Sequence, residues 1–284
     1  MSSQQPLPHL PHLPHLPHLP HLPHLPHLPP SQRPTRLAEM TTVEAADAVT
    51  SSPVVILPAG AFEQHGPGMP MATDTLRAEA VSDLVAAELG GRAVIGPSLP
   101  VGVSPHHLAF AGTVTLTTTT FAAVVREYVD SLYRHGWRKI LVVTGHGGNN
   151  ATLGTVAQDL LVTRPDLQFA WTPLTTLAPD AVADMRVGEV HGHSGEAETA
   201  QMLHLAPHLV HTDLLTPGPT ATADLDPLSR LSRRGHPALT VGYDRLSPNG
   251  VLGDPRRATA AAGQAIVDTA VSRIAAFVKE WLDA

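Results

Sequence analysis

Short apolar runs alternate with amphipathic stretches along most of the chain. Runs rich in β-branched residues have the pattern of strands buried on both faces, at residues 54–57, 93–95, 139–143 and 168–171. Apolar residues at helical spacing predict helices between them and a long final helix, over residues 75–89, 121–135, 150–162 and 257–282. Strands that alternate with helices indicate an α/β fold of three layers, α/β/α, in which helices cover both faces of a mostly parallel sheet.

Capping and turn residues divide this pattern into elements. Thr41-Thr42-Val43-Glu44 has the form of a capping box and predicts a short first helix. Gly90-Gly91 and Gly136 are stop signals for two of the helices. Residues 114–116 form a further candidate strand, whereas residues 213–256, rich in Pro, Gly, Asp and Ser, predict an irregular excursion.

Residues 1–34 differ in composition from the rest of the chain. The triplet Pro-His-Leu repeats seven times between Pro8 and Leu28. Proline at every third position fixes φ and lacks a backbone donor, so we expect a disordered, exposed arm that leans towards polyproline II. Its histidines could bind metal ions, but a low-complexity extension is the favoured interpretation. One folded domain is expected over residues 35–284.

The composition excludes several classes of function. The 284 residues carry a formal net charge of −7, with 15% charged and 4% aromatic residues, so no nucleic-acid partner is expected. The sequence contains no cysteine, which excludes disulfides, thiolate zinc sites and cysteine nucleophiles. Because no apolar run reaches the length of a membrane span, we expect a cytoplasmic protein without a membrane partner.

Side chains that can bind a metal ion follow the first predicted strand. Glu63 and His65 are two residues apart, so on an extended backbone their side chains project to one side. Asp74 comes nine residues after His65, beyond a loop that contains glycine and proline. Two carboxylates and an imidazole that converge at a strand end can form a metal site. A Glu-x-His pair is also common as two polar loop residues, and that alternative stays open on this stretch alone.

Two later segments repeat this arrangement. His146 follows the strand at 139–143, and Gly147 and Gly148 allow backbone to approach an ion or a substrate closely. Asn149 or Asn150 is placed to cap the next helix. Residues 191–199 supply two histidines and two glutamates beside glycine. In parallel sheets such segments meet beyond the carboxyl ends of the strands, so all three can line one crevice.

Four ordered motifs, LPAGAFEQHGPGMPMATDT, GTVTL, GHGGNN and HSGEAET, resemble the creatininase family of metal-dependent amidohydrolases. The resemblance runs from about Arg36 to the final helix and implies a creatininase-like fold. It also implies a ligand set: Glu63, His65, Asp74, His146 and Glu198. Five such ligands exceed the needs of one tetrahedral ion, which indicates two divalent ions with Asp74 between them. Zinc, manganese and iron(II) all suit these ligands.

The chain departs from the family pattern at one ligand. Creatinine-hydrolysing members place a carboxylate ligand at the position of Gly148, so a replacement must come from elsewhere. Glu196 and Glu198 are the candidates, and on a helix they point about 200° apart. The family pattern favours Glu198 as the ligand, which leaves Glu196 solvated or behind the ligands.

Other residues of the resemblance concern catalysis and substrate. His193 corresponds to a family histidine that moves a proton, a role that suits an imidazole beside metal-bound water. His107 lies in a loop that usually reads Glu-His, and it is either a contact to substrate or ligands or a satisfied buried histidine. Gly147, Gly148 and Asn149 are the remaining candidates for contact with substrate.

The resemblance implies cleavage of a C–N amide bond in a peptide or a small amide. Residues 247–255, SPNGVLGDP, together with GHGGNN, look most like the family branch that trims the precursor peptide of mycofactocin, removing a C-terminal Val-Tyr dipeptide. Creatinine or formamide-type hydrolysis is the alternative, and a non-catalytic metal-binding protein is a third. Family members also imply a homo-oligomer, a hexamer or larger.

Overall fold

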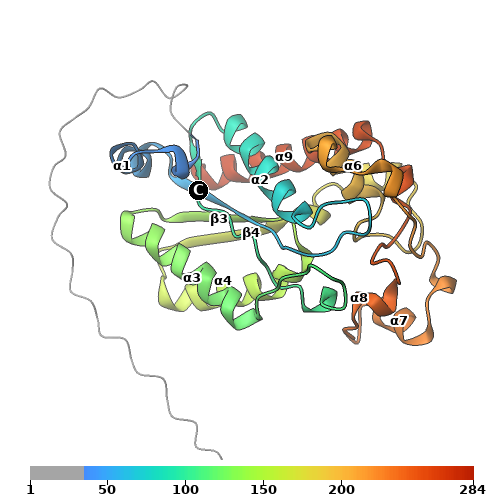
Figure 1. Ribbon diagram of the computed structural model, residues 1–284. Helices are drawn as coiled ribbons and strands as arrows, with labels where there is room; N and C mark the ends of the chain where they lie inside the picture. The colour runs from blue at the N-terminus through green and yellow to red at the C-terminus, as the bar shows by residue number, and fades with distance from the viewer. Residues whose placement is uncertain (1–34) are drawn as a thin grey trace, which may run out of the picture.

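A parallel sheet forms the centre of the fold in the computed structural model, which describes residues 35–284 (Figure 1). Its strands are β1 (Val54–Ala59), β2 (Ala93–Ile95), β3 (Lys139–Thr144) and β4 (Gln168–Pro173). Their order is β2-β1-β3-β4, and every pair is parallel. All four strands were predicted from the apolar runs. The arm predicted for residues 1–34 lies outside the described residues.

Helices cover both faces of the sheet, so the three-layer α/β/α architecture is confirmed (Figure 1). One face carries α1 (Thr42–Ser51), α3 (Thr118–His135) and α4 (Asn150–Thr163). The other carries α2 (Thr73–Glu88) and α9 (Ala260–Asp283). The shorter helices are α5 (Pro179–Asp184), α6 (Glu196–Leu205), α7 (Pro227–Ser232) and α8 (Tyr243–Leu246). Turns of 3₁₀-helix span Leu37–Glu39, Pro105–His107, Gly147–Asn149, Leu174–Thr176, Pro207–Leu209, Thr212–Leu214, Thr222–Asp224 and Pro255–Arg257.

Strand β1 supplies both halves of the core because its side chains alternate between the two faces. Val55 and Leu57 pack with α3 and α4, and Val54 and Ile56 pack with α2 and α9. Every residue of β1 is buried. A strand enclosed on both faces has no polar alternation, which is why an unbroken apolar run predicted it.

Threonine caps set the helix starts. Thr41 and Glu44 form the predicted capping box of α1. Helix α3 starts three residues before the predicted position because Thr117 accepts a hydrogen bond from the Thr120 N–H. Helix α2 starts two residues early, at Thr73, so Asp74 lies in its first turn. The helix therefore fixes the direction of this carboxylate.

The structure contradicts the strand predicted at residues 114–116 and agrees with the irregular excursion predicted at 213–256. Residues 114–116 do not form a strand; Val114 makes only an isolated antiparallel bridge to Phe62. Two hydrogen-bonded strands need a longer shared edge, and the chain turns into α3 immediately afterwards. The excursion at 213–256 is irregular as predicted, apart from α7, α8, the 3₁₀ turn Thr222–Asp224 and two 3₁₀ turns that overlap its ends.

Helix α9 is, within residues 35–284, the helix that is long and apolar enough to cross a membrane by length and composition alone. Its apolar residues form one buried face, at Gly263, Ile266, Val267, Ala270, Val271, Ile274, Ala275 and Val278. Spacings of three and four residues place these side chains on one stripe. The stripe packs on α2 and the sheet, so α9 is a core helix of this fold.

Candidate metal centre

The predicted ligands meet at the carboxyl ends of β1 and β3, where the chain leaves the two strands towards opposite faces of the sheet. Such a switch point opens a crevice at the strand ends. Gly60 and Gly145 let α2 approach this edge, because an added Cβ at Gly60 would lie 2.2 Å from Thr75 Oγ1 and one at Gly145 would lie 2.1 Å from the Asp74 carbonyl oxygen. The two glycines therefore position Asp74 over the strand ends.

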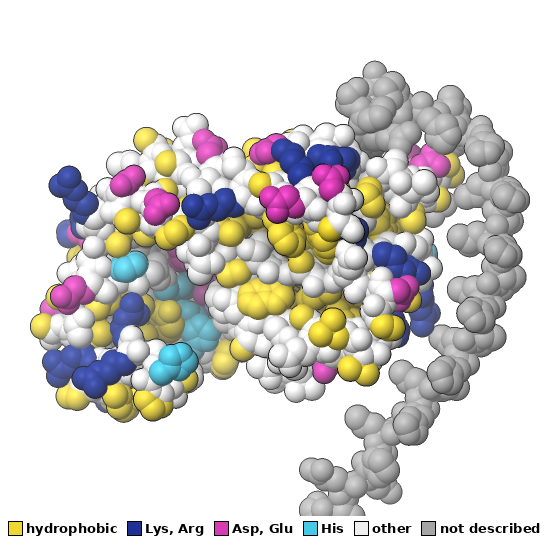
Figure 2. Space-filling view, turned by 180° about the vertical axis from the view of Figure 1, so that it is seen from behind, with side chains coloured by type: hydrophobic (Ala, Val, Ile, Leu, Met, Phe, Trp, Pro, Cys, Tyr) yellow, Lys and Arg dark blue, Asp and Glu magenta, His cyan; other side chains and the backbone are white. Residues whose placement is uncertain are grey.

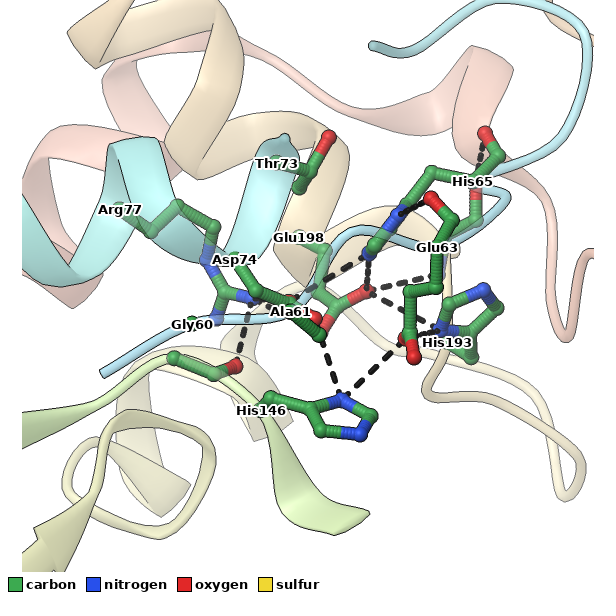
Figure 3. A network of polar contacts seen from close by, with 12 residues as sticks. Gly60, Ala61, Glu63, His65, Thr73, Asp74, Arg77, His146, His193 and Glu198 are labelled. Atoms are coloured by element: carbon green, nitrogen blue, oxygen red, sulfur yellow. Dashed lines mark hydrogen bonds and ion pairs between the residues drawn. The ribbon is translucent and has the colours of Figure 1, made fainter. Parts of the chain in front are cut away.

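Asp74 presents its two carboxylate oxygens to two different histidines (Figure 3). Oδ1 lies 3.4 Å from His65 Nε2, and Oδ2 lies 3.1 Å from His146 Nδ1. Glu63 Oε1 lies 3.2 Å from the same His146 nitrogen. A carboxylate with one oxygen towards each of two histidines has the arrangement of a bridging ligand.

Hydrogen bonds outside the centre fix which nitrogen of each histidine faces it. His65 Nδ1 donates to the Glu63 carbonyl oxygen at 3.1 Å, and His146 Nε2 donates to the Val103 carbonyl oxygen at 3.0 Å. We assign these tautomers from the hydrogen-bond network. In the neutral imidazoles, the inward nitrogens, His65 Nε2 and His146 Nδ1, then carry the lone pair and can coordinate an ion, the usual state of metal-binding histidines.

Buried polar atoms in this cluster lack hydrogen bonds. Both carboxylate oxygens of Glu63, His65 Nε2 and Asp74 Oδ2 have no hydrogen-bond partner among residues 35–284, and their residues are at most 1% exposed. Unsatisfied buried polar groups are costly, so their convergence calls for a binding partner. The ligand atoms of Glu63, His65 and Asp74 lie within 4.8 Å of one another. Oxygen and imidazole donors at this spacing fit divalent ions such as zinc, manganese or iron(II).

The charges of the cluster shift its pKa values in opposite directions. Burial would lower the pKa of His65, but Asp74, Glu198 and Glu63 outweigh burial and raise it to about 9. Burial alone would raise the pKa of Asp74, but His65 and His146 hold it well below its usual value. Burial, with the Asp74 charge, raises the pKa of Glu63. In the metal-free protein, protons on the imidazoles thus balance the carboxylate charge.

Glu198 reaches the centre from the first turn of α6. Its Oε2 lies 3.7 Å from His65 Nε2 and accepts a 2.7 Å hydrogen bond from the Ser194 N–H. Its Oε1 accepts a 2.8 Å hydrogen bond from Arg77 Nη1. Arg77 is fully buried and also bonds Gln201, and neither residue was predicted. The available signal was the spacing of Arg77 three residues after Asp74, which places both on one side of a helix.

Glu196 faces away from the ligand cluster, as the helix angle predicted, but it is not solvated. It is 1% exposed, and an added Cβ at Gly253 would lie 2.3 Å from its Oε2. Its nearest charged group is the Arg257 guanidinium, with Nη1 3.9 Å from Oε1. The loop that ends at Gly253 covers the start of α6, which excludes water from this carboxylate.

His193 lies beside the cluster with one nitrogen directed towards it. Its Nε2 donates to the Gln64 carbonyl oxygen at 2.7 Å, so Nδ1 carries the lone pair. Nδ1 lies 3.5 Å from Glu63 Oε1 and 4.0 Å from Glu198 Oε2. Burial, together with the nearby charge of His65, lowers the pKa of His193 well below its usual value. The imidazole is therefore neutral and placed to accept a proton at Nδ1.

His107 packs against His193, with ring centroids 4.3 Å apart, and is 1% exposed. Its Nδ1 accepts a 2.9 Å hydrogen bond from Gln64 Nε2, and its Nε2 lies 3.5 Å from Glu63 Oε1. Burial lowers the pKa of His107 to about 2. Gln64 and Tyr243 were not predicted; the Tyr243 ring lies against His107, tilted by 37° with the ring centroids 4.2 Å apart. Tyr243 lies in the irregular excursion, and only its rarity as an aromatic residue could have drawn attention to it.

Asn149 does not cap α4, contrary to prediction, because its side chain makes other hydrogen bonds. Its Oδ1 accepts from the Val103 N–H at 3.0 Å, and its Nδ2 donates to the Gly60 carbonyl oxygen at 3.0 Å. It therefore joins the loops around the site. Gly147 and Gly148 both line the cavity, and no atom lies within 4 Å of a Cβ placed at Gly147.

A cavity of about 430 Å³ opens over the cluster. Its lining combines the histidines and carboxylates of the cluster with the apolar side chains of Leu174, Ala178, Val182 and Ile266. Figure 2 shows histidine side chains in a hollow of the surface with Lys and Arg side chains beside it. Pockets that bind drug-sized ligands measure roughly 300–1,000 Å³, so the volume suits a substrate larger than a single small ring.

The sequence matches a family model and several proteins of known name. The family model for creatininase, described as creatinine amidohydrolase, matches residues 38–278. A mycofactocin precursor peptide peptidase from Mycolicibacterium smegmatis is 36% identical over 234 residues, which cover 81% of this chain and 85% of that protein. A creatinine amidohydrolase from Pseudomonas putida is 28% identical over 246 residues, which cover 80% of this chain and 89% of that protein.

Solved structures agree with this assignment. A creatininase crystal structure superposes with a TM-score of 0.75 at 26% identity, covering 87% of this chain and 98% of its own. Two further creatininase structures, each with a TM-score of 0.73 and 26% identity over the same shares, are described as the manganese form and as a variant of the Zn-Zn type. Sequence and structure together show that this chain belongs to the creatininase family of amidohydrolases, which are hydrolases acting on carbon–nitrogen bonds.

Proposed function

We propose that this chain is a metal-dependent peptidase with two divalent ions, which releases a C-terminal dipeptide from a precursor peptide. The observation that carries the proposal is the position of Asp74, whose two oxygens face His65 and His146 separately. Glu63 and His146 would hold one ion with Asp74, and His65 and Glu198 the other. The unpaired atoms of Glu63, His65 and Asp74 support this division.

Two divalent ions in this site would polarise the scissile carbonyl and lower the pKa of water. The chain itself supplies the proton transfer. His193 Nδ1 would accept a proton from the attacking water and pass it to the leaving amine, because its neutral imidazole faces Glu63 and Glu198. The hydrogen bond from His193 Nε2 to the Gln64 carbonyl oxygen holds the ring in the required orientation.

A peptide substrate is supported by the loop at 247–255. The Leu252 N–H donates to the His193 carbonyl oxygen at 2.9 Å, and the Gly250 carbonyl oxygen accepts from Gln64 Nε2 at 3.2 Å. The loop that resembles the mycofactocin branch therefore packs directly on the proposed catalytic histidine. The relatives named mycofactocin precursor peptide peptidase, at 32–36% identity, support a precursor-peptide substrate. The Val-Tyr end of that peptide is what the family resemblance implies.

Membership of a hydrolase family argues against the non-catalytic alternative, and Gly148 argues against creatinine. An added Cβ at Gly148 would lie 2.3 Å from both His146 Nε2 and the Val103 carbonyl oxygen. The carboxylate ligand of creatinine-hydrolysing members therefore has no room at this position in the chain.

A product assay tests the substrate. The metal-loaded protein is incubated with a peptide ending in Val-Tyr, the same peptide with an amidated C-terminus, creatinine, and a formamide. Mass spectrometry should detect free Val-Tyr from the first peptide, and EDTA should stop its release. Turnover of creatinine or the formamide without dipeptide release would contradict the peptidase proposal.

We also propose that the protein acts in the cytoplasm as a homo-oligomer, a hexamer or larger. Exposed apolar side chains at the end of α4, Leu161 and Val162, are 73% and 82% exposed and suit burial against another copy. Light scattering at micromolar concentration tests the assembly, and a monomer there would contradict it.

A further inference from the structure

Glu198, the replacement expected from the sequence, approaches His65 Nε2 at 3.7 Å and belongs to the other ion. The ion assigned to Glu63, Asp74 and His146 would therefore have three protein ligands, one fewer than the family pattern provides. The missing ligand corresponds to Gly148, where an added Cβ would also lie 3.0 Å from His106 Cε1. The imidazole of His106 thus lies where a side chain from position 148 would start. A side chain at position 148 would therefore collide with the ring of His106 in its present place.

His106 faces the same side of the cluster as His146. The two rings are parallel, with an interplanar angle of 5° and centroids 5.7 Å apart. The ligand atoms of Glu63, His106 and His146 lie within 4.8 Å of one another. Two nitrogens bound to one ion at about 2.1 Å lie no more than about 4.2 Å apart, so a shift of a few tenths of an ångström brings His106 into range.

Nothing else in residues 35–284 engages the ring nitrogens of His106, since no hydrogen bond to them is present there. The side chain is half-buried and lines the cavity. Its position is set from behind by the 3₁₀ turn Pro105–His107 and by contact with Tyr243, at 5.3 Å between ring centroids. The ring nitrogens of His106 thus face the ligand cluster without a hydrogen-bond partner among the described residues that would explain their position.

We propose that His106 is a ligand of the ion held by Glu63, Asp74 and His146, in place of the carboxylate that position 148 does not supply. This inference rests on the proposed two-ion function. It adds to that function a fourth protein ligand for one ion, supplied by a different segment of the chain.

The exchange of carboxylate for imidazole has a chemical consequence. Two divalent ions carry four positive charges, and Glu63, Asp74 and Glu198 supply three negative ones, so the centre keeps a positive charge. Imidazole also favours zinc, copper, iron and nickel, whereas carboxylate suits manganese. The ion at this position is therefore expected to prefer zinc or iron(II) over manganese.

Metal titration of the full-length protein tests the proposal. Zn²⁺, Mn²⁺ and Co²⁺ are titrated, in competition with a chromogenic chelator, into four metal-free proteins: wild type, His106→Ala, His106→Glu and His135→Ala. His135 is exposed at the end of α3 and outside the cavity, so its replacement is the matched control. All variants keep the histidines of residues 1–34, so any metal binding by those histidines adds the same background to every titration.

His106→Ala should lower the affinity for one of the two ions by at least about tenfold. It should also change the visible absorption of the Co²⁺ form. His106→Glu should hold both ions with a stronger relative preference for Mn²⁺, and His135→Ala should match wild type. Thermal unfolding of the metal-free proteins confirms folding, and His106→Gln replaces the alanine variant if that variant does not fold.

Each other outcome has a definite meaning. If His106→Ala binds both ions as tightly as wild type with an unchanged Co²⁺ spectrum, His106 is not a ligand, while the two-ion centre stands. A raised KM in that variant would then identify His106 as a contact to substrate. If wild type binds no ion at all, the proposed function itself fails.

Discussion

Arg77 Nη1 donates a 2.8 Å hydrogen bond to Glu198 Oε1, which joins the first turn of α6 to α2 beneath the proposed metal centre. The Arg77 side chain is fully buried, and Arg77 also bonds Gln201 at 3.1 Å and Asp74 at 3.4 Å. One cation thus orients two predicted ligands that come from different helices. Glu198 then directs Oε2, which also accepts from the Ser194 N–H, towards His65 Nε2 at 3.7 Å.

Replacing Arg77 should destabilise the protein strongly. Arg77→Met leaves Glu198 and Gln201 without their buried partner, and losing one member of a buried ion pair costs about 3–5 kcal/mol. Chemical denaturation of the metal-free protein measures the change. Arg126→Ala is the control, because the Arg126–Asp159 pair is exposed and such pairs contribute less than about 1 kcal/mol. Equal effects of the two replacements would contradict a structural role for Arg77.

Asp74→Ala should abolish turnover and sharply reduce bound metal, because both proposed ions lose a ligand. Glu196→Gln is the matched control: it removes a buried carboxylate of the same region that points away from the cluster. It should retain most of the metal and activity. Metal per chain and initial rates decide the point. If Glu196→Gln loses metal while Glu198→Gln keeps it, the ligand assignment on α6 is reversed.

His193→Ala should separate metal binding from proton transfer. The variant should keep its metal and slow turnover by about 10²–10⁴-fold, the usual contribution of a general acid or base. Metal content and kcat are measured on the same preparation. Loss of metal in proportion to activity would show that His193 acts as a ligand instead.

The sequence singled out the candidate ligands that lie next to strand ends and missed the residues that support them. Glu63 and His65 were visible because a buried strand ends just before them. The helix angle showed that Glu196 and Glu198 point apart, and the family resemblance favoured Glu198 as the ligand. Arg77 lies on α2 and Gln201 on α6, so their side chains meet only because these two helices pack together in the fold. Such approaches between distant segments leave no local periodicity.

The same limit explains the misassigned details. Asn149 has the composition of a cap, but its amide hydrogen-bonds Val103, Gly60 and Thr144. The solvated alternative for Glu196 failed because the covering loop ends more than fifty residues later in the chain. The local sequence therefore indicates a role for a side chain such as Asn149 or Glu196, but its contacts with distant segments determine the role that it has in the fold.

The stability of the metal-free protein should fall as the pH rises from 6.5 to 9. The folded protein raises the pKa of His65 from 6.5 to about 9, so the stabilisation is fully present below pH 6.5 and is lost as the pH rises through 9. The effect is on the order of 2–3 kcal/mol. Bound ions need the unprotonated imidazole, so the metal-loaded protein should not show this loss.

Thermal unfolding in EDTA and after metal reloading, at both ends of this range, measures the difference. Buried neutral histidines act in the opposite direction: burial lowers the pKa of His107 to about 2 and of His106 to about 4, so their contribution is lost as the pH falls below 6.5. The metal-free protein should therefore be most stable near neutral pH. A melting temperature that rises steadily towards pH 9 would contradict the assigned cluster.

Arg233 should recognise the C-terminal carboxylate of a peptide substrate. It follows α7, is exposed, and donates from Nη2 to the carbonyl oxygen of His191, which lines the cavity, at 3.2 Å. A charge-assisted hydrogen bond contributes about 1.5–3 kcal/mol, so Arg233→Ala should raise KM by roughly 10–100-fold with little change in kcat. Arg256→Ala is the matched control, because Arg256 is exposed and its side chain pairs with Asp254 rather than with a residue that lines the cavity. The test compares a peptide with a free C-terminus and its amidated form: the two should differ for wild type and become alike in Arg233→Ala. Equal losses on both peptides would show that Arg233 only supports the His191 backbone, and the carboxylate would then have to be bound elsewhere in the cavity.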